Sequence, residues 1–473
     1  MKRIINIHGL ITLATIVSLL SACSKSFTDK IPANQTSPEV ALGTEGAVGV
    51  ALNGMYAQLR STNLFGRSIP IVGDLMADNI YISSQNAGRY ILQYTYSVIP
   101  ADGFATGTWN DAYTGILRCN NIINDTLVKP SANMNEMQGE AYATRALLYF
   151  SLVNTYGKPY TDDPGSPGVP IVLVDSPYAE PTRNTVSQVF NQIVSDLKKA
   201  MSLCTIYTNS SQFSQFAAEG LLAKVYLYMG DYANAKASAL DVINNGGFTL
   251  VTADKLAAYW ASPEIRTDGI ETLFEVSSDK QNNNSSDALS AMYDQTYGYG
   301  DMLCSTDLYN LYSSTDVRAS WLQQGARGGG PAIFVNKYPN TGTTSNKDKT
   351  KVLRLSDVYL IAAETYQHSG ENANALTYLN DIAGNRDPNY TGYASTVTGP
   401  ALLDSIIQER RKELAFEGDR FYDLNRLKWA ISRSTDYIPA SVRNIAYGDT
   451  RRVAPIPLTQ TQTDPNIKQN PGY

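Results

Sequence analysis

Apolar and small residues recur at helical spacing across residues 217–245, and the pattern breaks once, at Gly230 and Asp231. The break predicts a tight turn, so this segment should fold as two short helices that pack against each other. Small residues on both sides of the turn allow the helices to approach closely. This layout is typical of a tetratricopeptide hairpin, which must stack on neighbours to bury its apolar stripe.

The same pattern returns further along the chain, which supports a repeat. The matching positions are Ala223, Tyr226, Gly230, Ala233, Asn234 and Ala235 in the first segment and Ala363, Tyr366, Gly370, Ala373, Asn374 and Ala375 in the second. Chance similarity between two alanine-rich helix pairs is the alternative, but the register holds through both helices and the turn. We therefore predict a second hairpin.

Helical periodicity extends over much of the remaining chain. It predicts helices over residues 45–59, 109–127, 140–156, 185–203, 353–367 and 402–416. We expect irregular structure over residues 64–100, a loop over residues 157–178, and no helix at the C-terminal end. The predicted fold class is therefore mainly α.

Residues 246–351 differ from the rest, because helical periodicity fades there and Asn, Ser, Gly and Tyr become frequent. A long irregular insertion in a helical protein is usually either functional or disordered. The aromatic residues within it argue against complete disorder. We predict a loop-rich insertion that the helices support.

The first residues match a bacterial lipoprotein signal. Lys2 and Arg3 provide the charged start, residues 4–20 are mostly apolar, and small residues lead to Cys23. We interpret residues 1–22 as a lipoprotein signal peptide and Cys23 as the acylated first residue of the mature chain.

A single transmembrane helix is the alternative, but the apolar segment is short and contains His8 and Gly9. With Cys23 acylated, residues 23–473 are expected to form a single domain, which the polar residues 24–38 tether to the lipid.

Three further cysteines are far apart and have no paired motif, so we expect them to pack as buried small hydrophobic residues. They are Cys119, Cys204 and Cys304.

Charge and composition exclude several classes of function. The formal net charge is −6, and no basic run is present, which argues against a nucleic-acid partner. Beyond the signal peptide the only histidine is His368, which excludes histidine-based triads and histidine-rich zinc sites. The glycine run at residues 325–330 lacks the lysine of a phosphate-binding loop.

Two other kinds of site stay open. A carboxylate pair of the glycosidase type leaves no sequence signature, so Asp74 with Asp78 or Asp301 is an alternative. The acidic loop at residues 161–168 is a conceivable calcium site, but it lacks the spaced ligands of a recognisable one. We expect a turn there and no cofactor.

Binding is the chemistry that the composition favours, since Tyr occurs 31 times and Phe only 12 times. Aromatic faces stack on sugar rings, while Asn and Arg bond the hydroxyl groups. The candidates in the irregular stretches are Asn79, Tyr81, Arg89, Tyr90, Tyr293, Tyr297, Tyr299 and Trp321. The alternative for each is that it packs a long loop onto the helical body.

Residues 409–427 closely resemble the C-terminal signature of the SusD/RagB family of outer-membrane nutrient-binding lipoproteins of Bacteroidetes. Residues 139–156 and 351–364, together with the ending from Pro455, resemble the same family. These motifs occur in the family's order, and with Cys23 they span the chain.

The resemblance implies a mainly α fold in which four tetratricopeptide-like hairpins support an irregular, loop-rich ligand-binding half. It also implies a lipid-anchored protein at the cell surface that covers a TonB-dependent transporter of the SusC kind. Such proteins capture oligosaccharides, or peptides in the RagB branch. The charged residues of the signature are interpreted as ion pairs between helices. They are Arg410, Arg411, Glu413 and Arg420.

Three hypotheses follow. The leading one is a non-catalytic lipoprotein that binds oligosaccharides and delivers them to a SusC-like transporter in the outer membrane. A peptide-binding protein of the RagB kind is the nearest alternative, because the same tyrosine-rich loops would serve. A helical-repeat scaffold without a small ligand is the third.

Overall fold

The computed structural model describes residues 41–176, 180–340 and 347–473. The predicted signal peptide at residues 1–22 and the predicted lipid attachment at Cys23 lie outside the described residues. Of the helices that the structure describes, none combines the length and apolarity needed to cross a membrane.

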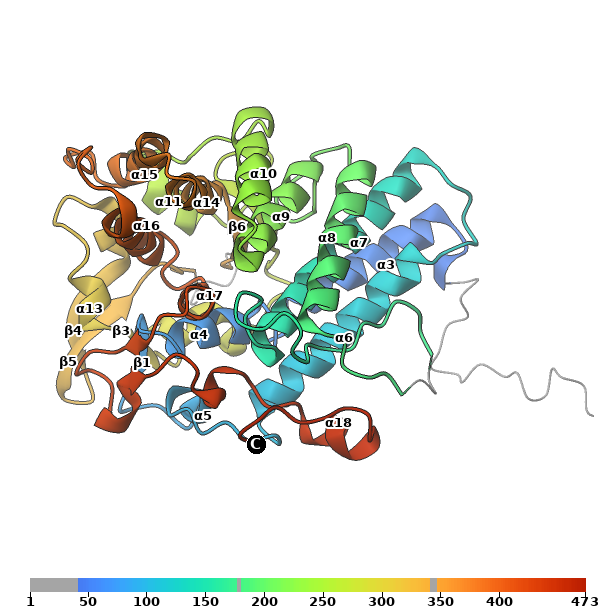
Figure 1. The fold of residues 1–473 in the computed structure, drawn as a ribbon, viewed down its shortest axis with the longest axis horizontal. Coiled ribbons are helices and arrows are strands. Elements are labelled where there is room, and N and C mark those ends of the chain that lie inside the picture. Colours follow the sequence, from blue (N-terminus) through green and yellow to red (C-terminus); the bar gives the residue numbers. More distant parts are fainter. Residues whose placement is uncertain (1–40, 177–179, 341–346) are drawn as a thin grey trace, which may run out of the picture.

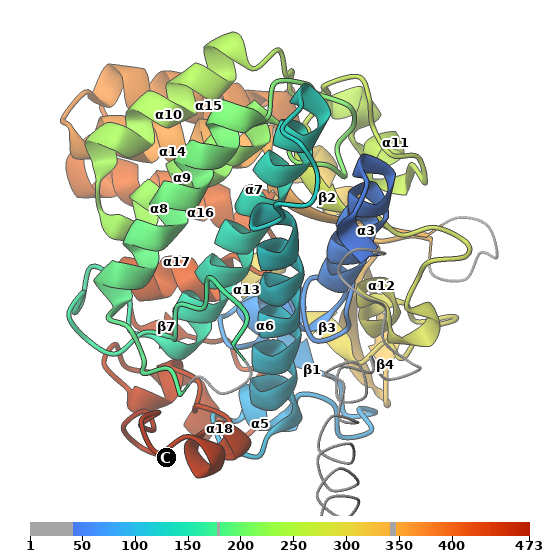
Figure 2. The same ribbon diagram turned by 90° about the vertical axis from the view of Figure 1, so that its right-hand side faces the viewer.

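Paired helices form one side of the molecule (Figure 1). Figure 2 shows how the pairs stack against one another. The pairs within the described chain are α3 (Glu45–Leu59) with α6 (Gly103–Ile123), α7 (Ala132–Tyr156) with α8 (Val186–Leu203), α9 (Gln215–Met229) with α10 (Tyr232–Asn245), and α14 (Leu355–His368) with α15 (Asn372–Arg386). The predicted mainly α, tetratricopeptide-like fold is confirmed.

Both predicted hairpins are present, and the turns explain their positions. Gly230 and Gly370 follow α9 and α14 with φ angles of 73° and 77°, a left-handed conformation that glycine adopts without strain. In the first hairpin, Ala223 of α9 and Ala235 of α10 are fully buried, which allows the two helices to pack closely.

Two long helices begin earlier than predicted because of N-terminal caps. The Asp102 carboxylate accepts hydrogen bonds from backbone N–H groups in the first turn of α6, and the Ser131 hydroxyl does the same for α7. These capping residues are visible in the sequence. The apolar periodicity that we followed begins only further along each helix.

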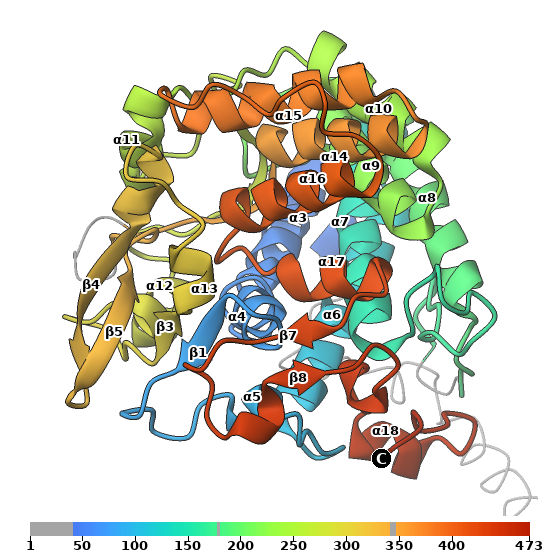
Figure 3. The same ribbon diagram turned by 60° about the vertical axis from the view of Figure 1, so that its left-hand side comes forward.

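The loop-rich half contains short elements and lies to one side of the helices (Figure 3). Residues 246–351 form η2 (Ala253–Lys255), α11 (Leu256–Ala261), β2 (Thr272–Val276), η3 (Ser285–Asp287), α12 (Leu289–Tyr293), β3 (Met302–Cys304), α13 (Thr306–Tyr309), η4 (Val317–Trp321), β4 (Leu322–Arg327), β5 (Gly330–Val335) and the start of β6 (Thr350–Arg354). In its described residues, 246–340 and 347–351, the predicted insertion is therefore irregular but ordered by short strands and helices.

The prediction of irregular structure over residues 64–100 was wrong in part. This stretch contains α4 (Ser68–Leu75), β1 (Ile80–Ile82) and α5 (Ile91–Tyr94). Every residue of α4 is buried, so its sequence has no polar face and no amphipathic period to detect. The C-terminal end, where we expected no helix, contains α18 (Leu458–Thr463).

The remaining C-terminal elements link the two halves. They are α16 (Gly399–Glu413), α17 (Arg420–Arg426), β7 (Ile431–Ser432), η5 (Ala440–Val442), β8 (Asn444–Ile445) and η6 (Thr450–Arg452). The described strands pair antiparallel in twos, as β1 with β3, β2 with β6, β4 with β5, and β7 with β8. The sheets are therefore small supports within a helical fold.

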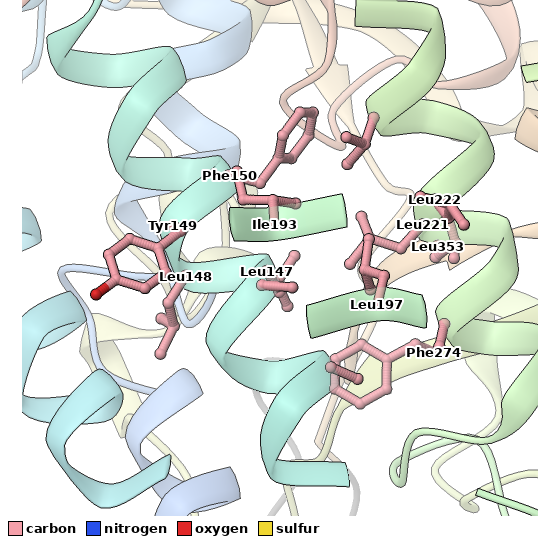
Figure 4. Packing of buried hydrophobic residues seen from close by; sticks show 14 of the residues in the cluster. Leu147, Leu148, Tyr149, Phe150, Ile193, Leu197, Leu221, Leu222, Phe274 and Leu353 are labelled. Carbon is pink, nitrogen blue, oxygen red and sulfur yellow. The ribbon is translucent and has the colours of Figure 1, made fainter. Parts of the chain in front are cut away.

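The main apolar core lies between the helices and the β2–β6 pair. Leu147 of α7, Leu197 of α8 and Leu221 of α9 are almost fully buried and belong to one cluster (Figure 4). Phe274 of β2 and Leu353 of β6 belong to the same cluster. This core joins the repeat helices to a strand pair of the loop-rich half.

Charged side chains from four elements meet in the interior around Glu413, at the end of α16. Its carboxylate oxygens lie 3.0 Å from Arg318, 2.8 Å from Arg354 and 3.0 Å from Arg386. Arg354 also contacts Glu271 at 2.8 Å. These side chains are at most 1% exposed, and the guanidinium groups hold the pKa of Glu413 well below its usual range.

The other charged residues of the C-terminal signature also form ion pairs, as predicted. Arg410 contacts Asp357 at 2.6 Å, and Arg420 contacts Asp78 at 2.8 Å. Arg411 lies 3.5 Å from the same Asp78 carboxylate. The signature therefore serves the packing of the fold.

Replacing Glu413 by Gln should destabilise the protein strongly. The change leaves three buried guanidinium groups around a neutral side chain, which should cost about 3–5 kcal/mol in the free energy of unfolding. Urea denaturation measures the loss. Glu371→Gln removes an exposed pair with Lys236 and is the control, for which we expect almost no change. Equal effects of the two substitutions would contradict this account.

Glu140 should make stability depend on pH. Burial raises the pKa of Glu140 to about 7, although the Tyr56 hydroxyl donates a hydrogen bond to its carboxylate. Between pH 4.5 and 7 the Glu140 carboxyl is ionised in the unfolded chain but still protonated in the native protein. The free energy of unfolding therefore falls as pH rises, by up to about 3 kcal/mol. Glu140→Gln should remove this loss, which parallel urea titrations of both proteins at pH 4.5 and 7.5 would detect. Unfolding free energies that change equally with pH in the two proteins would disprove this role of Glu140.

Candidate ligand-binding platform

Three segments meet at one edge of the molecule. The β1 strand pairs with β3 so that Tyr81 faces Leu303, and the Ser83 N–H donates to the Asp301 carbonyl at 2.8 Å. The loop after β1, residues 294–301 and the turn between β4 and β5 then come together (Figure 3). We call Arg89, Tyr297, Tyr299 and Arg327, which these segments carry, the arginine–tyrosine platform.

Arg89 is held between an aromatic ring and a carboxylate. Its guanidinium carbon lies 3.3 Å from the centre of the Tyr299 ring, and Nη1 donates to the Asp301 carboxylate at 2.9 Å. The Arg89 side chain is 28% exposed, and its other N–H groups have no partner among the described residues. A planar group fixed in this way can donate hydrogen bonds to a ligand without first losing conformational freedom.

Arg327 ties the β4–β5 turn to the neighbouring loops. Its guanidinium donates to Ser83 Oγ at 3.2 Å, to Gln295 Oε1 at 2.8 Å and to the Tyr299 carbonyl at 2.6 Å. Gly328 follows with a φ of 60° and lies so close to Ser84 that a Cβ atom would clash. Arg327 therefore positions Tyr299, and so also the surface on which Arg89 stacks.

Tyr297 is the most exposed aromatic residue of the platform. The residue is 72% exposed, while its backbone N–H donates to the Asp294 carboxylate at 3.1 Å. The same carboxylate accepts from Thr296 at 2.7 Å. The backbone is thus fixed by a local turn, and the aromatic ring is free to stack on a ligand.

Tyr81 and Tyr90 are half-buried beside the platform. Tyr81 packs 6.1 Å from the Tyr437 ring, and burial raises its pKa to about 12. The Tyr90 hydroxyl accepts from Arg67 at 2.9 Å and lies 2.8 Å from the Ser68 hydroxyl. Tyr90 therefore uses its polar group within the protein, at the start of α4.

Three predicted ligand residues lie in the interior instead. The Asn79 amide donates to Asp74 and its oxygen accepts from Arg411. Tyr293 is 1% exposed within an aromatic cluster, and Trp321 is 3% exposed. Because these side chains pack the loop-rich half, the prediction that they contact a ligand is corrected for Asn79, Tyr293 and Trp321.

Arg327 is the platform residue that we missed in the sequence. It lies in the glycine-rich turn that we interpreted only as a loop. Its contacts join segments that are far apart along the chain, and no local pattern records such contacts. The adjoining pair Gly328–Gly329, with φ angles of 60° and 82°, was the available signal for a tight hairpin.

The carboxylates that we considered as a catalytic pair each have separate partners. Asp78 pairs with Arg420, and the neighbouring arginines lower its pKa to about 2 despite burial. Burial raises the pKa of Asp74 to about 7, and Asp301 pairs with Arg89. Within the described residues, no group of three or more His, Cys, Asp or Glu side chains is arranged to hold a metal ion.

Cys119, Cys204 and Cys304 are free and buried, as predicted. Burial raises the pKa of each thiol, which keeps them protonated and unreactive. They therefore pack as small apolar residues and take no part in the platform.

Two family profiles match this chain. One is described as starch-binding and associating with the outer membrane and matches residues 27–227, and the other, the SusD family, matches residues 243–473. Together they account for the helical repeats, the loop-rich half and the C-terminal signature.

Individual relatives agree over nearly the whole chain. SusD-like protein P2 of Formosa agariphila is 26% identical over 97% of this chain and 98% of its own. A solved SusD superfamily structure from Bacteroides thetaiotaomicron is 29% identical, with a TM-score of 0.83 over 90% of this chain and all of that chain. A solved SusD superfamily structure from Bacteroides vulgatus is also 29% identical, with a TM-score of 0.84 over 91% of this chain and 99% of that chain. The signature motifs, the fold and these matches place the chain in the SusD/RagB family.

Proposed function

We propose that this protein binds oligosaccharides on the arginine–tyrosine platform. The observation that carries the proposal is the exposed Tyr297, two residues before the Tyr299 ring on which Arg89 is fixed. An aromatic face suits the apolar face of a sugar ring, and guanidinium N–H groups suit its hydroxyl groups. The starch-binding description of the family profile supports the same class of ligand.

The platform binds its ligand and leaves it intact. The Asp301 carboxylate is paired with Arg89, and the Asp294 carboxylate accepts two backbone N–H groups. Cleavage of a glycosidic bond needs an acid and a second carboxylate on opposite sides of the bond. The carboxylates of the platform are used to orient Arg89 and Tyr297, which favours a binding role.

The bound sugar is then passed to a SusC-like TonB-dependent transporter in the outer membrane. Acylation of Cys23 anchors the protein, and the platform faces the cell exterior and the transporter entrance. The lipoprotein-type start of the sequence and the outer-membrane description of the family profile support this location. A binding protein held beside the transporter raises the local concentration of its ligand.

Tyr297→Ala should weaken oligosaccharide binding about fivefold, because the loss of one stacked ring costs about 1 kcal/mol. Native-gel retardation against plant, fungal and host polysaccharides identifies the ligand, and calorimetry measures its affinity. Arg89→Lys keeps the charge but loses the planar stack, so it should weaken binding too.

Tyr390→Ala is the matched control, because Tyr390 is also exposed, at 38%, but lies on the loop after α15. It should bind like the unmodified protein. Unfolding curves verify that all variants remain folded. If no polysaccharide binds, or if Tyr297→Ala and Tyr390→Ala bind equally well, the platform is not a sugar site.

The transporter partnership predicts a stable complex in the native membrane. Affinity purification of the lipid-anchored protein after mild detergent extraction should recover a TonB-dependent barrel, identified by mass spectrometry. A Cys23→Ser variant should recover less, because it lacks the anchor that keeps the two proteins together. Purification of the anchored protein without any such barrel would refute the delivery step.

A further inference from the structure

Strand β4 has one edge that pairs with no other strand of the described chain. It pairs only with β5, in a register that sets Gln323 opposite Phe334 and Gly325 opposite Ala332. In Figure 1 and Figure 3, β4 lies at the outer margin of the molecule. Gln324, Gly325 and Ala326 are exposed, so a partner strand could approach this part of β4.

The register identifies the free backbone groups. The Asn336 N–H donates to the Trp321 carbonyl at 2.7 Å, so residues 321, 323, 325 and 327 exchange hydrogen bonds with the β5 side. The alternate residues Leu322, Gln324 and Ala326 then direct their N–H and C=O groups to the open edge. The Leu322 N–H already donates to the Ala319 carbonyl, so the groups of this edge without a partner among the described residues are the Leu322 carbonyl and the N–H and C=O groups of Gln324 and Ala326.

This edge lacks the usual protection against pairing. Natural edge strands carry charges, prolines or bulges that prevent another strand from adding. Residues 322–326 contain no charge and no proline, and their register is continuous. Arg327 is charged, but its guanidinium is bonded to Ser83, Gln295 and the Tyr299 carbonyl. The open edge is therefore uncharged and ready to accept a strand.

We propose that β4 pairs with β4 of a second copy of this chain. Antiparallel pairing about a two-fold axis at Gln324 sets Leu322 opposite Ala326 of the second copy and joins the two hairpins into a four-stranded sheet. Only uncharged residues face each other, and the Gln324 side chains lie opposite one another at the centre. A two-fold contact of this kind is closed, so it gives a dimer and no fibre.

The short strand makes this a weak contact in solution and a stronger one on a membrane. Three residues on each strand contribute hydrogen bonds, which is little for a stable interface between free proteins. Anchored copies share one surface, which raises their effective concentration. This step rests on the lipid anchor of the proposed function, whereas the pairing geometry does not.

Disulfide trapping of the full-length anchored protein tests the pairing. In the proposed register the two copies of residue 324 form a hydrogen-bonded pair with Cα atoms about 5.5 Å apart, which a disulfide can bridge. Mild oxidation of membranes with Gln324→Cys should give a covalent dimer at least tenfold more abundant than with Gln323→Cys, because position 323 faces residue 325 of the other copy. The described native cysteines are buried and should not contribute.

A second substitution shows whether the cross-link depends on strand pairing. Ala326 lies opposite Pro331 and takes no hydrogen bond from β5, so Ala326→Pro removes only the open-edge N–H. Combined with Gln324→Cys, Ala326→Pro should abolish the disulfide-linked dimer, whereas Ala326→Ser should preserve this dimer. Equal cross-linking at positions 323 and 324, no cross-linking at 324, or a dimer that survives Ala326→Pro would overturn the proposal. Gln324→Cys and Ala326→Ser leave the platform contacts of Arg327 in place and should be retarded by polysaccharide like the unmodified protein, so this result is independent of the sugar site.

Discussion

One buried carboxylate, Glu413, is shared by three guanidinium groups that come from distant parts of the chain. The same groups also pair with Asp316, Glu409, Glu271 and Glu417. Arg318 precedes β4, Arg354 ends β6, and Arg386 ends α15. None of these groups can be buried alone, because an unpaired charge in the interior is too costly. The repeat helices and the loop-rich half must therefore close around Glu413 together.

This constraint extends to the arginine–tyrosine platform through strand β4. Arg318 lies in η4, directly before β4, and its position fixes the base of the β4–β5 hairpin. The other end of β4 is Arg327, which bonds the Tyr299 carbonyl and so places the ring under Arg89. A charge network in the interior thus determines the geometry of a surface that it never touches.

The sequence was most informative where structure is local. The periodicity of α9 and α10 and the glycines after α9 and α14 predicted both hairpins, since helix faces and turn conformations are recorded in adjacent residues. The fully buried helix α4 was not predicted because its sequence has no polar face. Trp321, Tyr293 and Asn79 were misassigned because a loop-rich sequence does not reveal which of its side chains turn inward. Arg327 was missed because its partners are distant in sequence.

The turn at Asp294 fixes the backbone at residue 297 independently of the side chain that this residue carries. The Asp294 carboxylate fixes the backbone at residue 297 through N–H groups that any amino acid except proline supplies, while the Tyr297 side chain contributes little to the core. Exchange of this side chain therefore changes the chemistry of the surface at little expense to folding. Under the proposed function, position 297 is a place where ligand preference can change in a single step while the scaffold is kept.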